Sequence, residues 1–110
     1  MKRLYRVTKN SDFENIVHNG KKKISKEFSV YIMPNNLDHP RFGISVSKKR
    51  GNAVLRNKVK RQIRSIIYQN LSTFVPSDYV IVVKDQYLEQ DYETNTKKLL
   101  DLFVSPKKEK

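Results

Sequence analysis

The residues best suited to bind a ligand lie in one stretch, residues 47–64, which reads SKKRGNAVLRNKVKRQIR. On a helix of about 100° per residue, the apolar side chains of this stretch fall on one side and the basic and amide side chains on the other. No Asp or Glu occurs between Asp38 and Asp78, so the cations have no acidic neighbours in the sequence. Cations and amides on one helical face predict contacts with the phosphates and base edges of a nucleic acid. The polar face carries Arg56, Asn57, Lys60, Arg61 and Arg64.

A basic loop leads into this predicted helix and extends its positive charge. The N-terminus of a helix presents unpaired N–H groups and the positive end of the helix dipole, where phosphate oxygens bind. Most charged helix faces are simply solvated, but they usually mix both signs. Charges of one sign on adjacent turns repel each other and cost stability, so we expect this surface to serve an anionic partner. The loop consists of Lys48, Lys49, Arg50, Gly51 and Asn52.

Composition limits the possible partners. The chain has 110 residues, a formal net charge of +12 and a pI near 10.0, which is typical of proteins that bind nucleic acid or an anionic membrane surface. The sequence contains no run of 18 apolar residues, and no apolar segment follows the basic N-terminus. We therefore expect a cytoplasmic protein without a membrane partner. The lack of cysteine excludes disulfides, a thiol nucleophile and Cys-ligated zinc.

The sequence contains no recognisable motif of a hydrolytic active site. His18 and His39 belong to no HExxH motif, and we interpret both as surface residues. We interpret Glu89, Asp91 and Glu93 as the acidic start of a helix rather than as a metal site. A protein nuclease would need metal-binding carboxylates near the cations. We expect no catalytic residue, no metal site and no cofactor on the protein itself.

Hydrophobic periodicity predicts the elements that position these residues within one domain spanning residues 1–110. A capping box of Ser11 and Glu14 opens a short helix, which Gly20 ends. The remaining expectations are a basic connector (21–26), strands over 28–33 and 42–47, the long helix from 52 or 53 to near 70, a central strand (79–84), a last helix (88–104), and basic tails (1–10 and 105–110).

The first two strands are expected to form a hairpin with one open polar face. Turn residues over 34–40 join them. Alternation places Tyr31 and Ser45 on the face away from the core, beside Gly43. Aromatic and small side chains on a sheet face suit unstacked, single-stranded nucleotides. Because a helix precedes the strand over 79–84, we expect that strand to align in parallel with an earlier one.

The stretch over 47–64 closely resembles the RNR signature of the protein subunit of bacterial ribonuclease P. The resemblance extends to the short helix around Phe13, the FSVYIM and RFGISVSK strands, the later apolar strand and the closing amphipathic helix. It implies an α+β fold of the kind found in a ribosomal protein domain, with a small mixed sheet in the order αβββαβα. It also implies a left-handed crossover between parallel strands, against the usual right-handed rule.

The resemblance further implies a ribonucleoprotein enzyme whose RNA subunit, with Mg²⁺, removes the 5′ leader from precursor tRNA. By matching position, the residues for the catalytic RNA are Lys48, Lys49, Asn52, Arg56, Asn57, Lys60, Arg61 and Arg64, and those for the leader are Phe13, Val17, Tyr31 and Ser45. Val17 stands where the family often has an aromatic residue. Lys58 stands where the family often has arginine, so the charge is kept but the forked hydrogen-bond donor of the guanidinium group is lost. Residues 23–26 are more basic than is usual in the family, which predicts stronger contact with the leader. No protein oligomer is expected.

Two other functions remain open from the residues alone. A stand-alone RNA-binding or ribosome-associated module would bind RNA tightly without raising precursor cleavage. A DNA-binding protein could place the long helix in the major groove, but no turn and second helix precede it.

Overall fold

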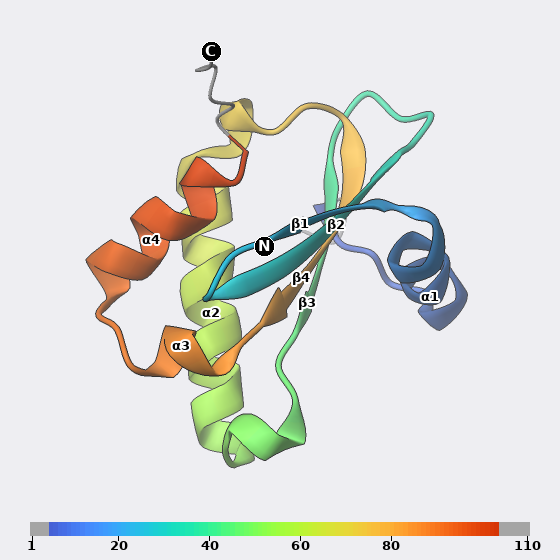
Figure 1. The fold of residues 1–110 in the computed structure, drawn as a ribbon. Helices are drawn as coiled ribbons and strands as arrows, with labels where there is room; N and C mark the ends of the chain where they lie inside the picture. Colours follow the sequence, from blue (N-terminus) through green and yellow to red (C-terminus); the bar gives the residue numbers. More distant parts are fainter. Residues whose placement is uncertain (1–4, 104–110) are drawn as a thin grey trace.

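The computed structural model describes residues 5–103, which form one α+β domain around a mixed four-stranded sheet (Figure 1). The strands are β1 (Lys21–Ile24), β2 (Phe28–Pro34), β3 (Arg41–Ser45) and β4 (Ser77–Val83). Their order across the sheet is β1-β2-β4-β3. β1 pairs antiparallel with β2, β2 pairs antiparallel with β4, and β4 pairs in parallel with β3.

The hairpin expected between β2 and β3 is wrong, because β4 lies between them. In the register, Val80 of β4 is opposite Tyr31 on one side and Gly43 on the other. β4 has the most continuous apolar sequence of the four strands, and only Val82 of its seven residues is not buried. A central position gives such a strand hydrogen-bonded neighbours on both edges and cover on both faces. The parallel alignment expected for this strand is confirmed, while the hand of the crossover stays a prediction.

The helices divide between the two faces of the sheet. α1 (Asn10–Asn19) packs on one face, against β2 and β4. α2 (Ala53–Gln69) and α4 (Tyr92–Asp101) lie on the other side (Figure 1). Short helical segments complete the chain, namely η2 (Lys48–Arg50), η3 (Leu71–Thr73) and α3 (Asp85–Leu88).

Several predicted boundaries are wrong. α1 starts at Asn10, and no side chain caps it, so the capping box of Ser11 and Glu14 does not form. The last helix, expected over 88–104, is α4 and begins only at Tyr92, because Asp91, in an extended conformation, accepts a hydrogen bond from the Thr94 N–H and caps it. The short α3 ends at Leu88, where the last helix was expected to begin. By contrast, β1 within the connector over 21–26 agrees with the order αβββαβα, which requires three strands before the long helix. In the expected basic tail over 1–10, Val7 N–H donates to Phe42 O at 3.0 Å; residues 1–4 and 104–110 lie outside the described residues.

The main core fills the space between the sheet and α2. Val59, Ile63, Ile66 and Ile67 supply the apolar side of α2 and are at most 3% exposed. They pack with the inward residues of β2 and β4. The predicted stripe is confirmed except at Leu55, which is 37% exposed. Fully burying one such side chain contributes about 1.5–3 kcal/mol, so this face of α2 fixes the direction of the opposite, basic face.

A smaller core holds α1 against the sheet. Ile16 and Val80 are buried there, at 1% and 0% exposure. Gly20 allows the close approach, since a Cβ at this position would lie 2.6 Å from Ile16 O and 2.9 Å from Ile32 O. Any side chain at residue 20 would therefore displace α1 from β2 together with Phe13 and Val17.

Candidate nucleic-acid interface

The predicted catalytic-RNA residues form one basic ridge on α2 and the loop before it. The basic ridge comprises Lys48, Lys49, Asn52, Arg56, Asn57, Lys60, Arg61 and Arg64. Arg56, Lys60 and Arg64 are partly buried, and the others are exposed. Within residues 5–103, the ion pairs involve His39 and Arg41 as cations and none of the ridge. The absence of acidic partners expected from the sequence therefore holds for the ridge in three dimensions.

Local hydrogen bonds fix the loop that starts the ridge. Ser47 Oγ accepts from Lys49 N–H at 3.2 Å and caps η2. Asn52 Oδ1 accepts from Leu55 N–H at 2.9 Å and caps α2. Arg56 Nε donates to Gly51 O at 3.2 Å, which ties the helix to the loop. Asn52 thus has a structural role that its position in the signature did not reveal, and its amide N–H groups remain available to RNA.

Gly51 is required by the shape of this loop. Its φ of 146° lies in a region that favours glycine. A Cβ at this position would also lie 2.5 Å from Leu55 Cδ2. A side chain here would displace either the loop or the first turn of α2, and with it the spacing between Lys49 and Arg56.

The four predicted leader residues lie on the face of the sheet that α1 covers only in part. Phe13 and Val17 extend from α1, Tyr31 lies on β2 and Ser45 lies on β3, and all four are partly buried. Ser45 is opposite Val82, which is opposite Ser29, so Ser45 and Tyr31 share a face but are separated by β4. We call this surface the open sheet face; it comprises Phe13, Val17, Lys22, Ile24, Ser29, Tyr31, Ser45 and Val82.

Three residues of the open sheet face were not predicted. Lys22 is opposite Tyr31 in the register, and its Nζ lies 5.4 Å from the centroid of the Tyr31 ring. Ile24 is 58% exposed, and Val82 is the partly exposed residue of β4. The KKKI stretch and the continuous apolar run of β4 gave no periodic signal from which these positions could be inferred.

Lys23 has a different role from the one expected. Its Nζ donates to Leu102 O at 2.8 Å, at the C-terminal end of α4. A cation there satisfies a free carbonyl and complements the helix dipole. The stronger leader contact expected from the basic segment 23–26 therefore does not include the Lys23 ammonium group in this conformation.

A hollow of about 160 Å³ joins the open sheet face to the basic ridge. Arg6, Lys60 and Arg64 line it together with Phe13, and no acidic residue is among its lining residues. Phe13 lies directly on β3, since a Cβ at Gly43 would be 2.8 Å from the Phe13 ring. The membership of Arg6 in this site was not predictable from the sequence, because the bridge between Arg6 and Phe42 is a long-range contact.

Arg41, unlike the ridge cations, is neutralised. Its Nε and Nη2 donate to the two carboxylate oxygens of Asp78 at 2.9 and 2.6 Å, and Asn35 Nδ2 donates to Asp78 Oδ1 at 2.8 Å. Burial tends to raise the pKa of Asp78, but the hydrogen bonds from Arg41 and Asn35 prevail and lower it. This cluster fixes the paired start of β3 and β4 and is not a free phosphate site.

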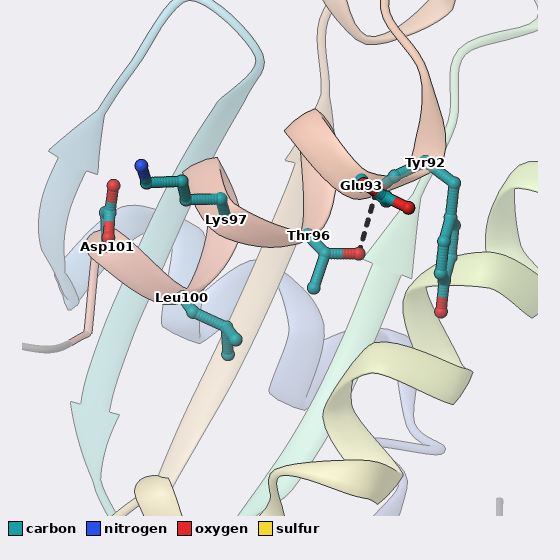
Figure 2. A pocket seen from close by; sticks show the side chains of 6 residues that line it. All are labelled: Tyr92, Glu93, Thr96, Lys97, Leu100 and Asp101. Atoms are coloured by element: carbon teal, nitrogen blue, oxygen red, sulfur yellow. Dashed lines mark hydrogen bonds between the residues drawn. The ribbon is translucent and has the colours of Figure 1, made fainter.

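A hollow of about 430 Å³ lies along α4 (Figure 2), and no residue of the basic ridge lines it. Tyr92, Thr96 and Leu100 line it with neighbouring charged residues of the same helix. Thr96 Oγ1 donates to Tyr92 O at 2.8 Å within the helix. None of the predicted site residues lines this hollow, and it offers no convergent polar groups from a second element.

Among residues 5–103, no group of three or more His, Cys, Asp or Glu side chains lies close enough to hold a metal ion. No described helix has the length and apolar character needed to cross a membrane.

The α+β fold, the unpaired cations on α2 and the partly open sheet face together define a protein of the RNA-binding class. Comparisons with known proteins give the particular family. The family model described as Ribonuclease P matches residues 1–107. The chain belongs to the family of ribonuclease P protein components.

Relatives and solved structures agree with this assignment. The ribonuclease P protein component of Mycoplasma capricolum is 45% identical over 100 residues, covering 88% of this chain and 91% of the relative. The component of Streptococcus agalactiae is 38% identical over 103 residues, covering 94% of both chains. A Staphylococcus aureus RNase P protein mutant superposes with a TM-score of 0.86 at 37% identity, covering 91% of this chain and 86% of that one. The Thermotoga maritima protein gives a TM-score of 0.83 at 32% identity, covering 89% and 94%.

These findings confirm the family, the α+β fold and the function expected from the sequence. The protein is the accessory subunit of an endoribonuclease that processes tRNA, and its partner is the RNA subunit of that enzyme. The alternative of a stand-alone RNA-binding module is not favoured. The roles of individual side chains stay predictions.

Proposed function

We propose that the open sheet face binds the single-stranded 5′ leader of precursor tRNA while the basic ridge binds the catalytic RNA subunit. One observation carries this division of roles. The hollow at the edge of β3 is lined by Phe13 of the open sheet face and by Lys60 and Arg64 of the ridge. An RNA strand that leaves the open sheet face through this hollow meets the cations of α2 next. The precursor tRNA and the RNA subunit would therefore lie side by side.

The chemistry of the open sheet face suits an unpaired strand. The Tyr31 ring and the exposed Ile24 offer apolar surfaces to unstacked bases. Ser45 offers a small hydroxyl on the edge strand β3. Lys22 holds a positive charge over the Tyr31 ring and is placed to meet a backbone phosphate. These contacts tolerate different bases, as a subunit that accepts many leaders requires.

The chemistry of the basic ridge suits a folded RNA. From Asn52 to Arg64 the helix rises about 18 Å at 1.5 Å per residue, with cations or amides on successive turns of the same face. A rigid row of this kind tracks phosphates and positions them without reading much sequence. The Mg²⁺ for hydrolysis belongs to the RNA subunit in this proposal, and the protein acts as a cytoplasmic monomer until it joins that RNA.

The decisive experiment measures cleavage of precursor tRNA by the RNA subunit at low Mg²⁺, with and without this protein. We expect faster cleavage with the protein, and no acceleration would refute the proposal. A second measurement tests the sheet face. Tyr31→Ala should weaken binding of leader-bearing precursor more than binding of mature tRNA, because only the precursor reaches the open sheet face. Loss of one aromatic stacking contact corresponds to about 1–3 kcal/mol.

A matched control is available for the tyrosine substitution. Tyr68 is 52% exposed on α2 and belongs neither to the ridge nor to the open sheet face. Tyr68→Ala should leave both binding constants within about twofold of the original protein. If Tyr31→Ala weakened precursor and mature tRNA equally, the leader would have to bind elsewhere.

A further inference from the structure

A separate hollow of about 150 Å³ lies where α2, α3 and α4 meet. Its rim is formed by Leu55, Leu88 and Tyr92, which are 37%, 37% and 38% exposed. Apolar side chains gathered around one hollow, rather than scattered singly, form the kind of surface that binds ligands. An engineered protein cavity of about 150 Å³ holds benzene, so a single six-membered aromatic ring matches the size of this hollow.

The floor of the hollow contains a buried acceptor without a partner. Asn95 is 1% exposed, and its Oδ1 has no hydrogen-bond partner among the described residues. The amide cannot be turned over, because Nδ2 donates to Tyr87 O at 2.9 Å and Gln90 O at 3.4 Å, and both of these are acceptors. A buried carbonyl oxygen in this state destabilises the protein unless a donor reaches it. Oδ1 is therefore suited to receive an N–H group.

Two glutamines give the floor a fixed polarity. Gln90 Nε2 donates to Glu27 Oε2 at 2.7 Å, which leaves the Gln90 carbonyl oxygen as an acceptor. Tyr87 OH donates to Gln62 Oε1 at 2.7 Å, which leaves Gln62 Nε2 as a donor. Burial raises the pKa of Tyr87 to about 12, so its hydroxyl stays protonated at neutral pH. Among the side-chain amides that line the hollow, the groups left without a partner within residues 5–103 are thus two acceptors, on Asn95 and Gln90, and one donor, on Gln62.

The base whose edge best complements this pattern is cytosine. Its exocyclic amino group carries two hydrogens for the two acceptors, and its N3 and O2 accept from Gln62. Uracil has a single ring N–H and leaves one acceptor unpaired. The Tyr92 ring, which extends from the start of α4 toward α2 (Figure 2), and the Leu55 side chain supply apolar surfaces for the faces of the ring.

The position of the hollow points to RNA as the source of the base. Lys58 lines the hollow and follows Asn57 of the basic ridge on the same helix. Its ammonium group has no ion-pair partner within the described part of the chain, so it is free to meet the phosphate of a bound nucleotide. We propose that this hollow binds one unpaired cytosine of an RNA partner, inserted between Leu55 and Tyr92 and read by Gln62, Gln90 and Asn95. This inference rests on the RNA partnership of the family and not on the leader site.

An NMR titration of the full chain with nucleosides tests the proposal. Nucleosides carry no phosphate, so binding to the cations of the basic ridge does not contribute. The side-chain amide resonances of Gln62, Gln90 and Asn95 should shift saturably with cytidine, in the millimolar range, and uridine should bind about tenfold more weakly. Inorganic phosphate should shift ridge resonances instead. If cytidine leaves the three side-chain amides unmoved, or moves resonances across the whole surface equally, the hollow is not a base site.

Matched variants separate recognition from folding. Gln62→Glu keeps an acceptor for Tyr87 OH but replaces the donor, and it should weaken cytidine binding about tenfold. Val54→Ala is the control, since Val54 is 78% exposed, adjoins Leu55 and does not line the hollow. Its affinity for cytidine should be unchanged, and equal losses in the two variants would overturn the assignment.

Dimethyl sulfate probing of the assembled enzyme extends the test to RNA. At least one cytosine N3 should be protected by the original protein and by Val54→Ala, and should regain reactivity with Gln62→Glu. Protection of adenines alone would overturn the proposal. Cytidine binding without faster precursor cleavage would count against the proposed function only, whereas faster cleavage without cytidine binding would count against this hollow only.

Discussion

Arg61 offers the sharpest test of the basic ridge. Its side chain is exposed and makes no hydrogen bond or ion pair with the described residues. Arg56, by contrast, is bonded to Gly51 O, and Lys60 and Arg64 are partly buried. Arg61→Ala therefore removes a charge without disturbing the fold, so a change in RNA affinity reports the charge itself.

The expected magnitude follows from counterion release. Each phosphate contact contributes about −0.9 to the slope of log affinity against log salt concentration. If all the basic side chains of the ridge contact phosphates, the slope for the original protein lies near −5. Arg61→Ala should reduce its size by about 0.9, so the affinity ratio of original protein to variant should fall about threefold between 50 and 200 mM salt. The six side chains are Lys48, Lys49, Arg56, Lys60, Arg61 and Arg64.

The assay is a titration of labelled RNA subunit at several salt concentrations, read by fluorescence anisotropy. Arg61→Lys should restore most of the slope, because the slope depends on charge and not on the forked geometry of arginine. Lys98→Ala removes an exposed charge on α4, outside the ridge, and should leave the slope unchanged. An unchanged slope for Arg61→Ala, or an equal change for Lys98→Ala, would refute the ridge as the RNA surface.

Three further predictions concern the framework that positions these surfaces. The folded-state pKa of Asp78 lies below its ordinary value of 3.8, so its ionised form contributes stability that is present above that value and is lost as pH falls through the lower folded pKa. Asp78→Asn should lower the midpoint of urea unfolding at neutral pH and reduce the loss of stability as the pH falls. The same dependence of stability on pH in the variant and the original protein would contradict the role given to the Arg41–Asp78 pair. Gly20→Ala should destabilise the fold by about 1–3 kcal/mol, because its Cβ would lie 2.6 Å from Ile16 O, and the same variant should weaken leader binding; full stability would mean that α1 can shift without cost. Ile63→Ala should cost about 2–5 kcal/mol in chemical unfolding, whereas Leu55→Ala, at a site 37% exposed, should cost less than half as much. Similar losses at the two sites would show that the apolar side of α2 is not what orients the ridge.

Local patterns were sufficient for the parts of the site that one element carries. The polar and apolar sides of α2 follow from helical periodicity, and Val59 and Ile63 are buried as expected. The outward direction of Tyr31 and the inward direction of Val30 follow from alternation along one strand. Such features depend on residues a few positions apart, so the chain order alone specifies them.

Strand pairing was not accessible in this way. β2 and β3 are adjacent in the sequence, and the intervening turn favoured a hairpin, yet β4 pairs with both. The choice depends on how well each strand is covered on both faces, and that coverage comes from α1 on one side and α2 on the other. As a result, Val82 became part of the open sheet face and Lys23 was directed toward α4.

The amino-acid order by itself determined that this protein has an uncompensated basic helix face over an apolar side, and this was enough to predict a surface for nucleic acid. The resemblance of residues 47–64 to a family signature then pointed to an enzyme subunit. Tertiary structure alone decided which surfaces meet, namely that Arg6 joins Lys60 and Arg64 beside Phe13, and that Asn95 closes a hollow beside Leu55. The physical reason is the distance along the sequence between the residues that each feature depends on. Charge and amphipathicity are properties of neighbouring residues, whereas a hollow exists only after distant segments have packed and left a space between them.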